Sequence, residues 1–165
     1  MQRMIFQRGK NGGRIVLGEA SLGLIQRYIQ TKSDMNEAGG MLLGRLIINS
    51  EDVIVDEATE PTKKDKQFRF FFWRSKVDAQ VKVNEAWRNS DKTRVYLGEW
   101  HTHPEDVPSP SCIDLKNWRR IVRKSTFEYD SLFFLIAGRV EIRIWELHRG
   151  ERAPVLLQQC NDLLQ

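Results

Sequence analysis

Residues 99–118 read Glu-Trp-His-Thr-His-Pro-Glu-Asp-Val-Pro-Ser-Pro-Ser-Cys-Ile-Asp-Leu-Lys-Asn-Trp. The β-branched and aromatic residues at and just before the start of this stretch predict a strand over residues 94–103. Three prolines after the second histidine predict a loop that returns the chain. Ser111 then precedes apolar residues at the helical period, so we expect it to be the N-cap of a helix over residues 112–124. The stretch therefore predicts a strand, a short loop and a helix that begins beside the end of the strand.

This arrangement brings together three residues that suit a metal ion. His101 and His103 are two of the three histidines in the chain, and alternation along a strand puts both imidazoles on one face. Asp114 falls in the first helical turn, where the helix dipole favours a carboxylate. Catalytic Zn²⁺ sites use three such nitrogen and oxygen ligands, at roughly 2.0 to 2.2 Å, and keep the fourth position open to water. Although Ser-x-x-Asp is by itself an ordinary capping box, the two histidines lead us to predict that all three residues bind Zn²⁺.

The spacing His101-x-His103-x7-Ser111-x-x-Asp114 resembles the signature of the JAB/JAMM metalloproteases, the catalytically competent branch of the MPN domain. Those zinc hydrolases cleave ubiquitin-like conjugates. The family also has an upstream glutamate before a Gly-containing apolar strand, and residues 37–48 resemble that element: Glu-Ala-Gly-Gly-Met-Leu-Leu-Gly-Arg-Leu-Ile-Ile. The resemblance covers about residues 15–146. It implies that Glu37 is the general base and that Ser111 stabilises the oxyanion together with the metal.

Within this family the chain is similar to the JAB proteases of bacterial CBASS anti-phage operons. The similarity lies in the Gly-rich segment after Glu37, in the Phe/Trp-rich residues 68–73, and in Gly-Glu-Trp-His-Thr-His-Pro at residues 98–104. It implies an isopeptidase that cuts after the C-terminal residue of a cGAS-like nucleotidyltransferase joined to another protein. One alternative is a deubiquitinase-like or sulfur-carrier-processing protease from another bacterial conjugation operon, which would use the same chemistry.

A RadC-like or scaffold MPN protein, associated with DNA or with an assembly, is an alternative of a different class. RadC relatives show His-Asn-His-Pro-Ser-Gly where this chain has His-Thr-His-Pro-Glu-Asp at residues 101–106, which weighs against it. The net charge of +4 could also suggest nucleic acid, but the excess is modest and no nucleic-acid motif is present. We therefore expect a solvated helix face, or a contact with an acidic patch of a partner, for the basic cluster Arg119, Arg120, Arg123 and Lys124.

Several other polar residues compete for a role at the site. Glu99 shares the strand phase of the two histidines, so it either supports them or is an ordinary solvated carboxylate. Glu105 and Asp106 lie in the loop, where we expect solvation rather than ligation. His148 follows a separate predicted strand and is expected to be a surface or structural histidine. Cys112 is expected to be a small first-turn residue, because the histidines that a cysteine nucleophile would need are already predicted ligands.

The order of predicted elements is α+β. It resembles the MPN fold, a curved mixed β-sheet flanked by helices, which we expect to form a single domain over residues 1–165. A capping box of Ser75 with Asp78 is expected to begin the second helix, and Val77 and Val81 follow its helical period. The expected elements are a helix over 15–31, strands over 41–48 and 53–58, a buried strand over 68–73, helices over 75–89 and 112–124, a strand over 94–103, and a hairpin near 131–147.

Composition supports a globular protein that acts in the cytoplasm. Of the 165 residues, 41% are hydrophobic and 29% are charged, which is typical of globular chains. No stretch approaches the roughly 18 consecutive apolar residues of a membrane span. The N-terminal residues lack a secretory apolar core, and two cysteines offer no disulfide framework.

Overall fold

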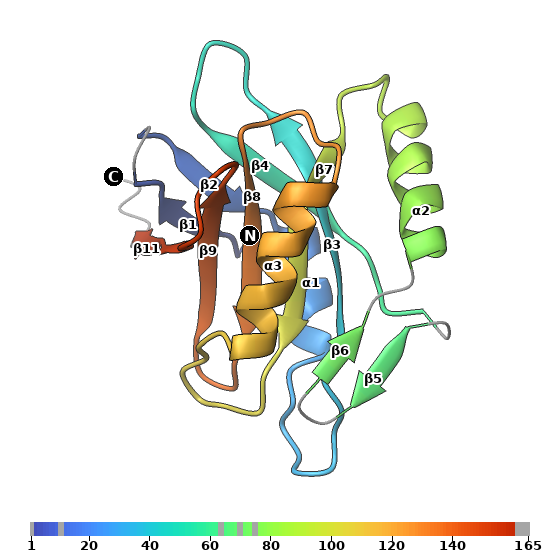
Figure 1. The fold of residues 1–165 in the computed structure, drawn as a ribbon, viewed down its shortest axis with the longest axis vertical. Coiled ribbons are helices and arrows are strands. Elements are labelled where there is room, and N and C mark those ends of the chain that lie inside the picture. Colours follow the sequence, from blue (N-terminus) through green and yellow to red (C-terminus); the bar gives the residue numbers. More distant parts are fainter. Residues whose placement is uncertain (1, 10–11, 63–64, 69–70, 74–75, 161–165) are drawn as a thin grey trace.

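The computed structural model describes residues 2–9, 12–62, 65–68, 71–73 and 76–160. A mixed nine-stranded sheet forms its centre, in the order β10-β9-β8-β7-β3-β4-β2-β1-β11 (Figure 1). The pairs β2·β4 and β7·β8 are parallel and the others are antiparallel. The α+β class and the mixed sheet flanked by helices are therefore confirmed. The strands are β1 Met4–Gln7, β2 Arg14–Leu17, β3 Gly39–Leu46, β4 Val53–Ala58, β5 Lys66–Phe68, β6 Phe71–Trp73, β7 Val95–Thr102, β8 Ser131–Ala137, β9 Ile142–His148, β10 Val155–Leu156 and β11 Gln158–Cys160, and the helices are α1 Glu19–Arg27, α2 Lys76–Asn89 and α3 Cys112–Lys124.

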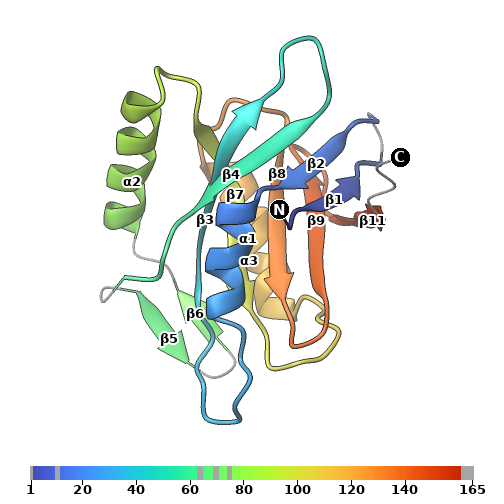
Figure 2. The same ribbon diagram turned by 180° about the vertical axis from the view of Figure 1, so that it is seen from behind.

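The helices cover opposite faces of the sheet. Helix α3 crosses one face (Figure 1), and α1 lies against the other (Figure 2). Every residue of strand β8 is buried, because both faces of the strand are covered. Phe134 packs beneath α3 on one face, and Phe133 packs into the core on the α1 side. Alternating side chains that are buried on both faces explain why this strand is an unbroken apolar run. Within the described residues, no helix has the length and apolar character that crossing a membrane requires.

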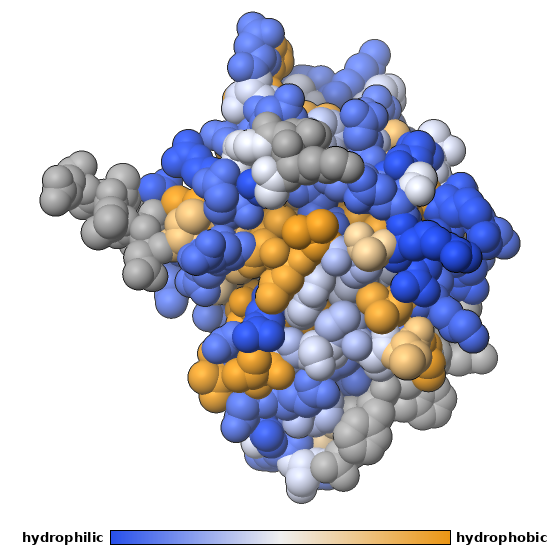
Figure 3. Space-filling model, turned by 60° about the vertical axis from the view of Figure 1, so that its left-hand side comes forward, coloured by the Kyte–Doolittle hydropathy of each residue, from blue (hydrophilic) through white to orange (hydrophobic). Residues whose placement is uncertain are grey.

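The sheet curves until its two edges nearly meet at the C-terminal segment. Strand β10 pairs with β9 at one edge, and β11 pairs with β1 at the other. Arg8, which is buried just after β1, donates to Glu146 of β9 from Nη2 at 2.6 Å and from Nε at 3.3 Å. One segment thus covers two edges whose backbone groups would otherwise be open to pairing. Figure 3 shows this side of the molecule, with hydrophobic side chains at the surface among hydrophilic ones.

The predicted helix over residues 15–31 is wrong in its first part and too long. Residues 14–17 form strand β2, in which Ile15 and Leu17 are completely buried and Gly18 donates its backbone N–H to Val55. The helix α1 begins only at Glu19 and ends at Arg27. The apolar residues at 15 and 16 fit the helical period by coincidence, because both pair with the parallel strand β4 and Ile15 is buried in the sheet.

The segment between β4 and α2 also departs from the prediction. Where one buried strand was predicted over 68–73, residues 66–68 and 71–73 form a separate two-stranded sheet, and residues 69–70 lie outside the described residues. The predicted N-cap Ser75 lies outside them as well. Helix α2 is where we expected it, but Val77 and Val81 face solvent, and its buried residues are Ala79 and Ala86.

The remaining elements agree with the prediction. The strands at 41–48 and 53–58 are β3 and β4, an antiparallel pair. Strand β7 covers most of residues 94–103, and β8 with β9 forms the expected hairpin. Helix α3 runs over the predicted residues 112–124 with Ser111 as its N-cap.

Candidate metal site and adjoining cleft

Antiparallel pairing of β3 with β7 brings a distant glutamate to the two histidines. The register pairs Gly39 with His101, and the backbone N–H of Thr102 donates to Ala38 at 2.9 Å. Continuing this register carries the chain to Glu37, whose Oε1 lies 3.7 Å from Nε2 of His103. Gly40 is required here, because a Cβ at that position would lie 2.2 Å from the backbone oxygen of Thr59. Pairing of these strands therefore delivers the glutamate of the predicted site.

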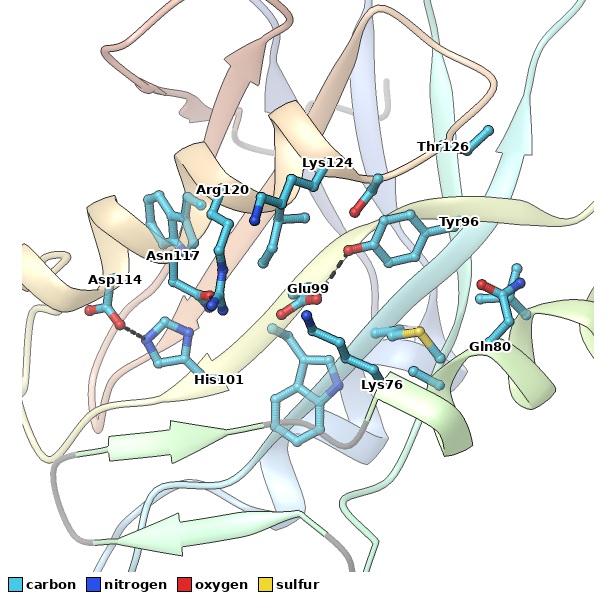
Figure 4. Close-up of a pocket in the computed structure, with 17 residues that line it drawn as sticks. Lys76, Gln80, Tyr96, Glu99, His101, Asp114, Asn117, Arg120, Lys124 and Thr126 are labelled. Carbon is cyan, nitrogen blue, oxygen red and sulfur yellow. Dashed lines mark hydrogen bonds and ion pairs between the residues drawn. The ribbon is translucent and has the colours of Figure 1, made fainter.

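The side chains of His101, His103 and Asp114 converge on one point. The two Nε2 atoms are 3.0 Å apart, and Asp114 places Oδ1 3.3 Å from His101 and Oδ2 3.2 Å from His103. Figure 4 shows Asp114 pointing from α3 toward His101 on β7. A tetrahedral ion with bonds of about 2.0 to 2.1 Å holds its ligand atoms roughly 3.3 Å apart. The spacing of these atoms therefore fits a metal ion bound between them.

The start of helix α3 fixes the position of Asp114. Its backbone N–H donates to Oγ of Ser111 at 3.1 Å, and the Ser111 N–H donates to Oδ2 of Asp114 at 2.7 Å. This reciprocal capping box is the ordinary arrangement at a helix start. The carboxylate that caps the helix is also the one that reaches both histidines. Sequence reasoning had treated the capping box and the metal ligand as competing interpretations, and the two arrangements coexist.

One buried carboxylate, Glu37, and one partly buried carboxylate, Asp114, make the group suited to a cation. Burial raises the pKa of Glu37 to about 8, although the nearby His103 acts to lower it. Burial acts to raise the pKa of Asp114 as well, but hydrogen bonds from the two imidazoles outweigh it and lower that pKa. For His103, burial acts to lower the pKa, and Asp114 and Glu37 raise it overall.

Among the described residues, the ion pairs of Glu37 and Asp114 are formed with the histidines, not with Lys or Arg. Buried charge of this kind is costly unless a partner neutralises it. Ligand atoms of Glu37, His101 and His103 all lie within 4.8 Å of one another, so these side chains can hold a metal ion together with Asp114.

A hydrogen-bonded strut that sequence reasoning missed joins the histidine strand to the glutamate loop. Thr102 lies between the two histidines and is completely buried, with its side chain on the other face of β7. Its Oγ1 accepts from the Ala38 N–H at 3.0 Å and donates to Oε1 of Gln30 at 3.0 Å. Nε2 of Gln30 donates onward to the Met35 carbonyl at 2.9 Å. The strut therefore holds the loop that carries Glu37 against the strand that carries His101 and His103.

The competing polar residues take other positions. Glu99 accepts a hydrogen bond from the Tyr96 hydroxyl at 3.1 Å and lines a neighbouring cleft rather than the group of predicted ligands. In the loop, Asp106 pairs with Arg139 at 2.7 Å. Glu105 accepts from the Ser109 N–H at 3.1 Å, and its Oε2 lies 3.8 Å from Nδ1 of His103.

The two remaining residues considered from the sequence lie outside the group of predicted ligands, His101, His103 and Asp114, which we call the ligand group. His148 lies 3.4 Å from Glu146 in the Arg8 network, which agrees with the structural role predicted for it. Cys112 is an exposed first-turn residue of α3, as the sequence suggested.

A cleft of about 520 Å³ leads away from His101 and Asp114. Helix α2 forms one wall and α3 the other, while β7 and Met41 of β3 form the floor (Figure 4). The predicted basic cluster is divided between this cleft and the outer surface. Arg120 and Lys124 line the cleft, whereas Arg123 is exposed and does not line it, and Arg119 donates to the Arg152 carbonyl at 2.8 Å.

Comparison with known proteins gives consistent matches. Three curated relatives carry the name CD-NTase/cGAS isopeptidase. The Pseudomonas aeruginosa (strain BWHPSA011 / Pa011) protein is 37% identical over 121 residues, covering 73% of this chain and 75% of the relative. The Escherichia coli (strain TW11681) protein is 33% identical over 144 residues, covering 87% and 88%. The Vibrio cholerae (El Tor Inaba N16961) protein is 34% identical over 135 residues, covering 82% of each.

A solved structure and a family model give matches that agree with these relatives. The solution structure of protein DSY2949 from Desulfitobacterium hafniense superposes with a TM-score of 0.57 at 20% identity, covering 85% of this chain and 87% of that one, which shows a shared fold. Residues 20–148 match the family described as prokaryotic homologs of the JAB domain. With this match over most of its length, the chain belongs to that family of JAB-domain proteins.

Proposed function

We propose that the protein is a zinc-dependent isopeptidase that releases a CD-NTase from proteins to which its C-terminal residue has been joined, within CBASS anti-phage defence. The observation that carries this proposal is the convergence of two imidazoles and a carboxylate beside a second, buried carboxylate. The names of the curated relatives supply the substrate class. We expect the enzyme to act in the cytoplasm, where conjugated CD-NTase would be found.

His101, His103 and Asp114 would hold the metal. Two imidazole nitrogens and one carboxylate oxygen form a donor set that suits Zn²⁺. When bound, Zn²⁺ supplies Lewis acidity, which lowers the pKa of a coordinated water to about 7 and polarises the scissile carbonyl. Asp114 contacts both imidazoles within 3.3 Å, whereas Glu37 lies 3.7 Å from one of them, so Asp114 is the better third ligand.

Glu37 would then act as the general base. Its carboxylate lies beside the two imidazoles, with Oε1 3.7 Å from Nε2 of His103, farther than either contact of Asp114. Oε1 would accept the proton of the attacking water and later pass it to the departing amine, which in an isopeptide bond is a lysine ε-amine. The raised pKa of Glu37 would suit this return of the proton, and a cation between the histidines would keep the carboxylate ionised beforehand.

Ser111 would stabilise the negative charge that develops on the carbonyl oxygen. Its Oγ already accepts the Asp114 N–H, which leaves the hydroxyl hydrogen for the substrate. A single preorganised donor of this kind contributes on the order of 3 kcal/mol to transition-state stabilisation. The capping box thus would serve the helix and the reaction with the same hydroxyl group.

The test is cleavage of a CD-NTase whose C-terminal residue is joined to a reporter protein. Wild type should cut after that residue, while Glu37→Gln and chelator-treated enzyme should not, and added Zn²⁺ should restore the treated enzyme. The matched control is Glu19→Gln, the same change at an exposed residue of α1. Glu37→Gln should still bind zinc. Cleavage by Glu37→Gln at the wild-type rate would refute the assignment of the base.

If wild type retains zinc but leaves the CD-NTase fusion intact, the substrate class is wrong. The same assay would then use ubiquitin-like conjugates and sulfur-carrier fusions from other bacterial operons, which need no change in the chemistry described above. Failure on these as well, together with salt-dependent DNA binding, would favour a RadC-like role.

A further inference from the structure

The cleft beside the metal-binding group carries more positive than negative side chains. Among its described lining residues, Lys76 comes from α2, and Arg120 and Lys124 come from α3. Glu99 is the acidic residue in the lining apart from Asp114, which belongs to the ligand group. Figure 4 shows Lys76, Arg120 and Lys124 placed around Glu99, along the path that leads away from His101. A ligand that extends along the cleft from the metal end therefore meets net positive charge.

The shape of the cleft suits an extended peptide. Its two walls are helices, its volume is about 520 Å³, and its lining includes apolar side chains such as Met41, Val83 and Ile121. A cleft of this size takes a short segment and not a folded surface. In an isopeptide substrate, the acyl side is the C-terminal tail of the conjugated protein, while the amine side is a lysine on a folded target. The tail is the part that can enter as an extended chain.

The helix geometry sets the position along the tail that each basic residue would meet. At 1.5 Å per residue, Arg120 lies about 9 Å and Lys124 about 15 Å along α3 from Asp114. An extended peptide advances about 3.3 Å per residue. Arg120 therefore lies level with about the third residue from the scissile bond, and Lys124 with about the fifth.

We infer that the cleft selects substrate tails with acidic side chains about three to five residues before the scissile bond. Lys76, Arg120 and Lys124 are then specificity-determining residues. This inference rests on the proposed function, and it adds a sequence preference that the ligand group cannot provide. Solvent-exposed charge pairs are weak individually, so we expect a preference of about three- to tenfold for Glu over Gln at these positions.

The experiment uses the CD-NTase–reporter conjugate described above, with the third, fourth and fifth residues before the bond all changed to Glu, Gln or Lys. We would measure kcat/KM for each tail with wild type and with Lys124→Glu. Wild type should prefer Glu to Gln to Lys, and Lys124→Glu should shift the preference toward Lys. High salt should reduce the difference, because exposed charge pairs are screened.

The matched control is Arg123→Glu, because Arg123 has the same charge and lies next to Lys124 on α3 but does not line the cleft. It should keep the wild-type preference. Equal kcat/KM for all three tails, or an equal shift by Arg123→Glu, would overturn the inference. If Lys124→Glu does not fold, Lys76→Glu tests the opposite wall. An intact conjugate with every tail would instead refute the proposed function, and the inference with it.

Discussion

Replacing Thr102 by Val tests the strut between the histidine strand and the glutamate loop. Valine keeps the shape of the threonine side chain but has no hydroxyl group. The Ala38 N–H, which is buried, then loses the hydroxyl oxygen that accepts its hydrogen bond, and the bond from Thr102 to Gln30 is lost as well. An unsatisfied buried polar group costs about 1 to 3 kcal/mol, so loss of the acceptor of the Ala38 N–H should lower the free energy of unfolding by about 1 to 3 kcal/mol. Urea denaturation measures this loss, and Thr102→Ser should restore most of it.

The same substitution should lower activity by a different route. Ala38 is the neighbour of Glu37, and without the hydroxyl its N–H is no longer bonded to residue 102, although the backbone bond from residue 102 to the Ala38 carbonyl remains. The looser attachment allows the Glu37 carboxylate to move relative to His101, His103 and Asp114. Because a misplacement of about 1 Å can cost a hundredfold in rate, we expect kcat to fall between ten- and a hundredfold while zinc content stays at the wild-type value. Cleavage at saturating substrate and metal analysis check both points. A variant that loses stability but keeps kcat would show that the hydrogen bonds of Thr102 do not position the Glu37 carboxylate.

Three further predictions concern other side chains of the site and the core. Ser111→Ala should lower the stability of the protein by about 1 kcal/mol through loss of the N-cap, and kcat by about a hundredfold; unchanged kcat in the cleavage assay would exclude the hydroxyl from the reaction. Asp114→Asn should weaken zinc binding at least tenfold in competition with a chelator, and wild-type affinity would remove Asp114 from the ligand set. Arg8→Met should lower the free energy of unfolding by about 3 to 5 kcal/mol, because Glu146 stays buried without its cation; a smaller loss in thermal unfolding would mean that water reaches the carboxylate.

The sequence predicted best those parts of the site that are close together in the chain. His101, His103, Ser111 and Asp114 span a strand, a loop and one helical turn, and each has a local signal: alternation, proline or capping. Glu37 has no such signal from its own neighbours. Its place depends on the pairing of β3 with β7, and only the family resemblance pointed to it.

Features that depend on tertiary contacts could not be predicted from local patterns in the sequence. Residues 14–17 fit a helical period as well as a strand, and parallel pairing with β4 decided the outcome. Val77 and Val81 fit a buried helical face, yet α2 packs through its alanines. Thr102 offered one clue, since it must point away from the histidines that flank it, but its partner Gln30 is distant in the sequence.

The paired edges of the sheet have a consequence for synthesis of the protein. Strand β9 can pair with β10, and β1 with β11, only after residues 155–160 have left the ribosome, because β10 and β11 come from that segment. Until then the nascent chain has two open strand edges, which are templates for aggregation. The residues of the candidate metal site, by contrast, are all synthesised well before this point. A stalled or shortened chain would therefore depend on chaperones even though it already carries every residue of the proposed active site.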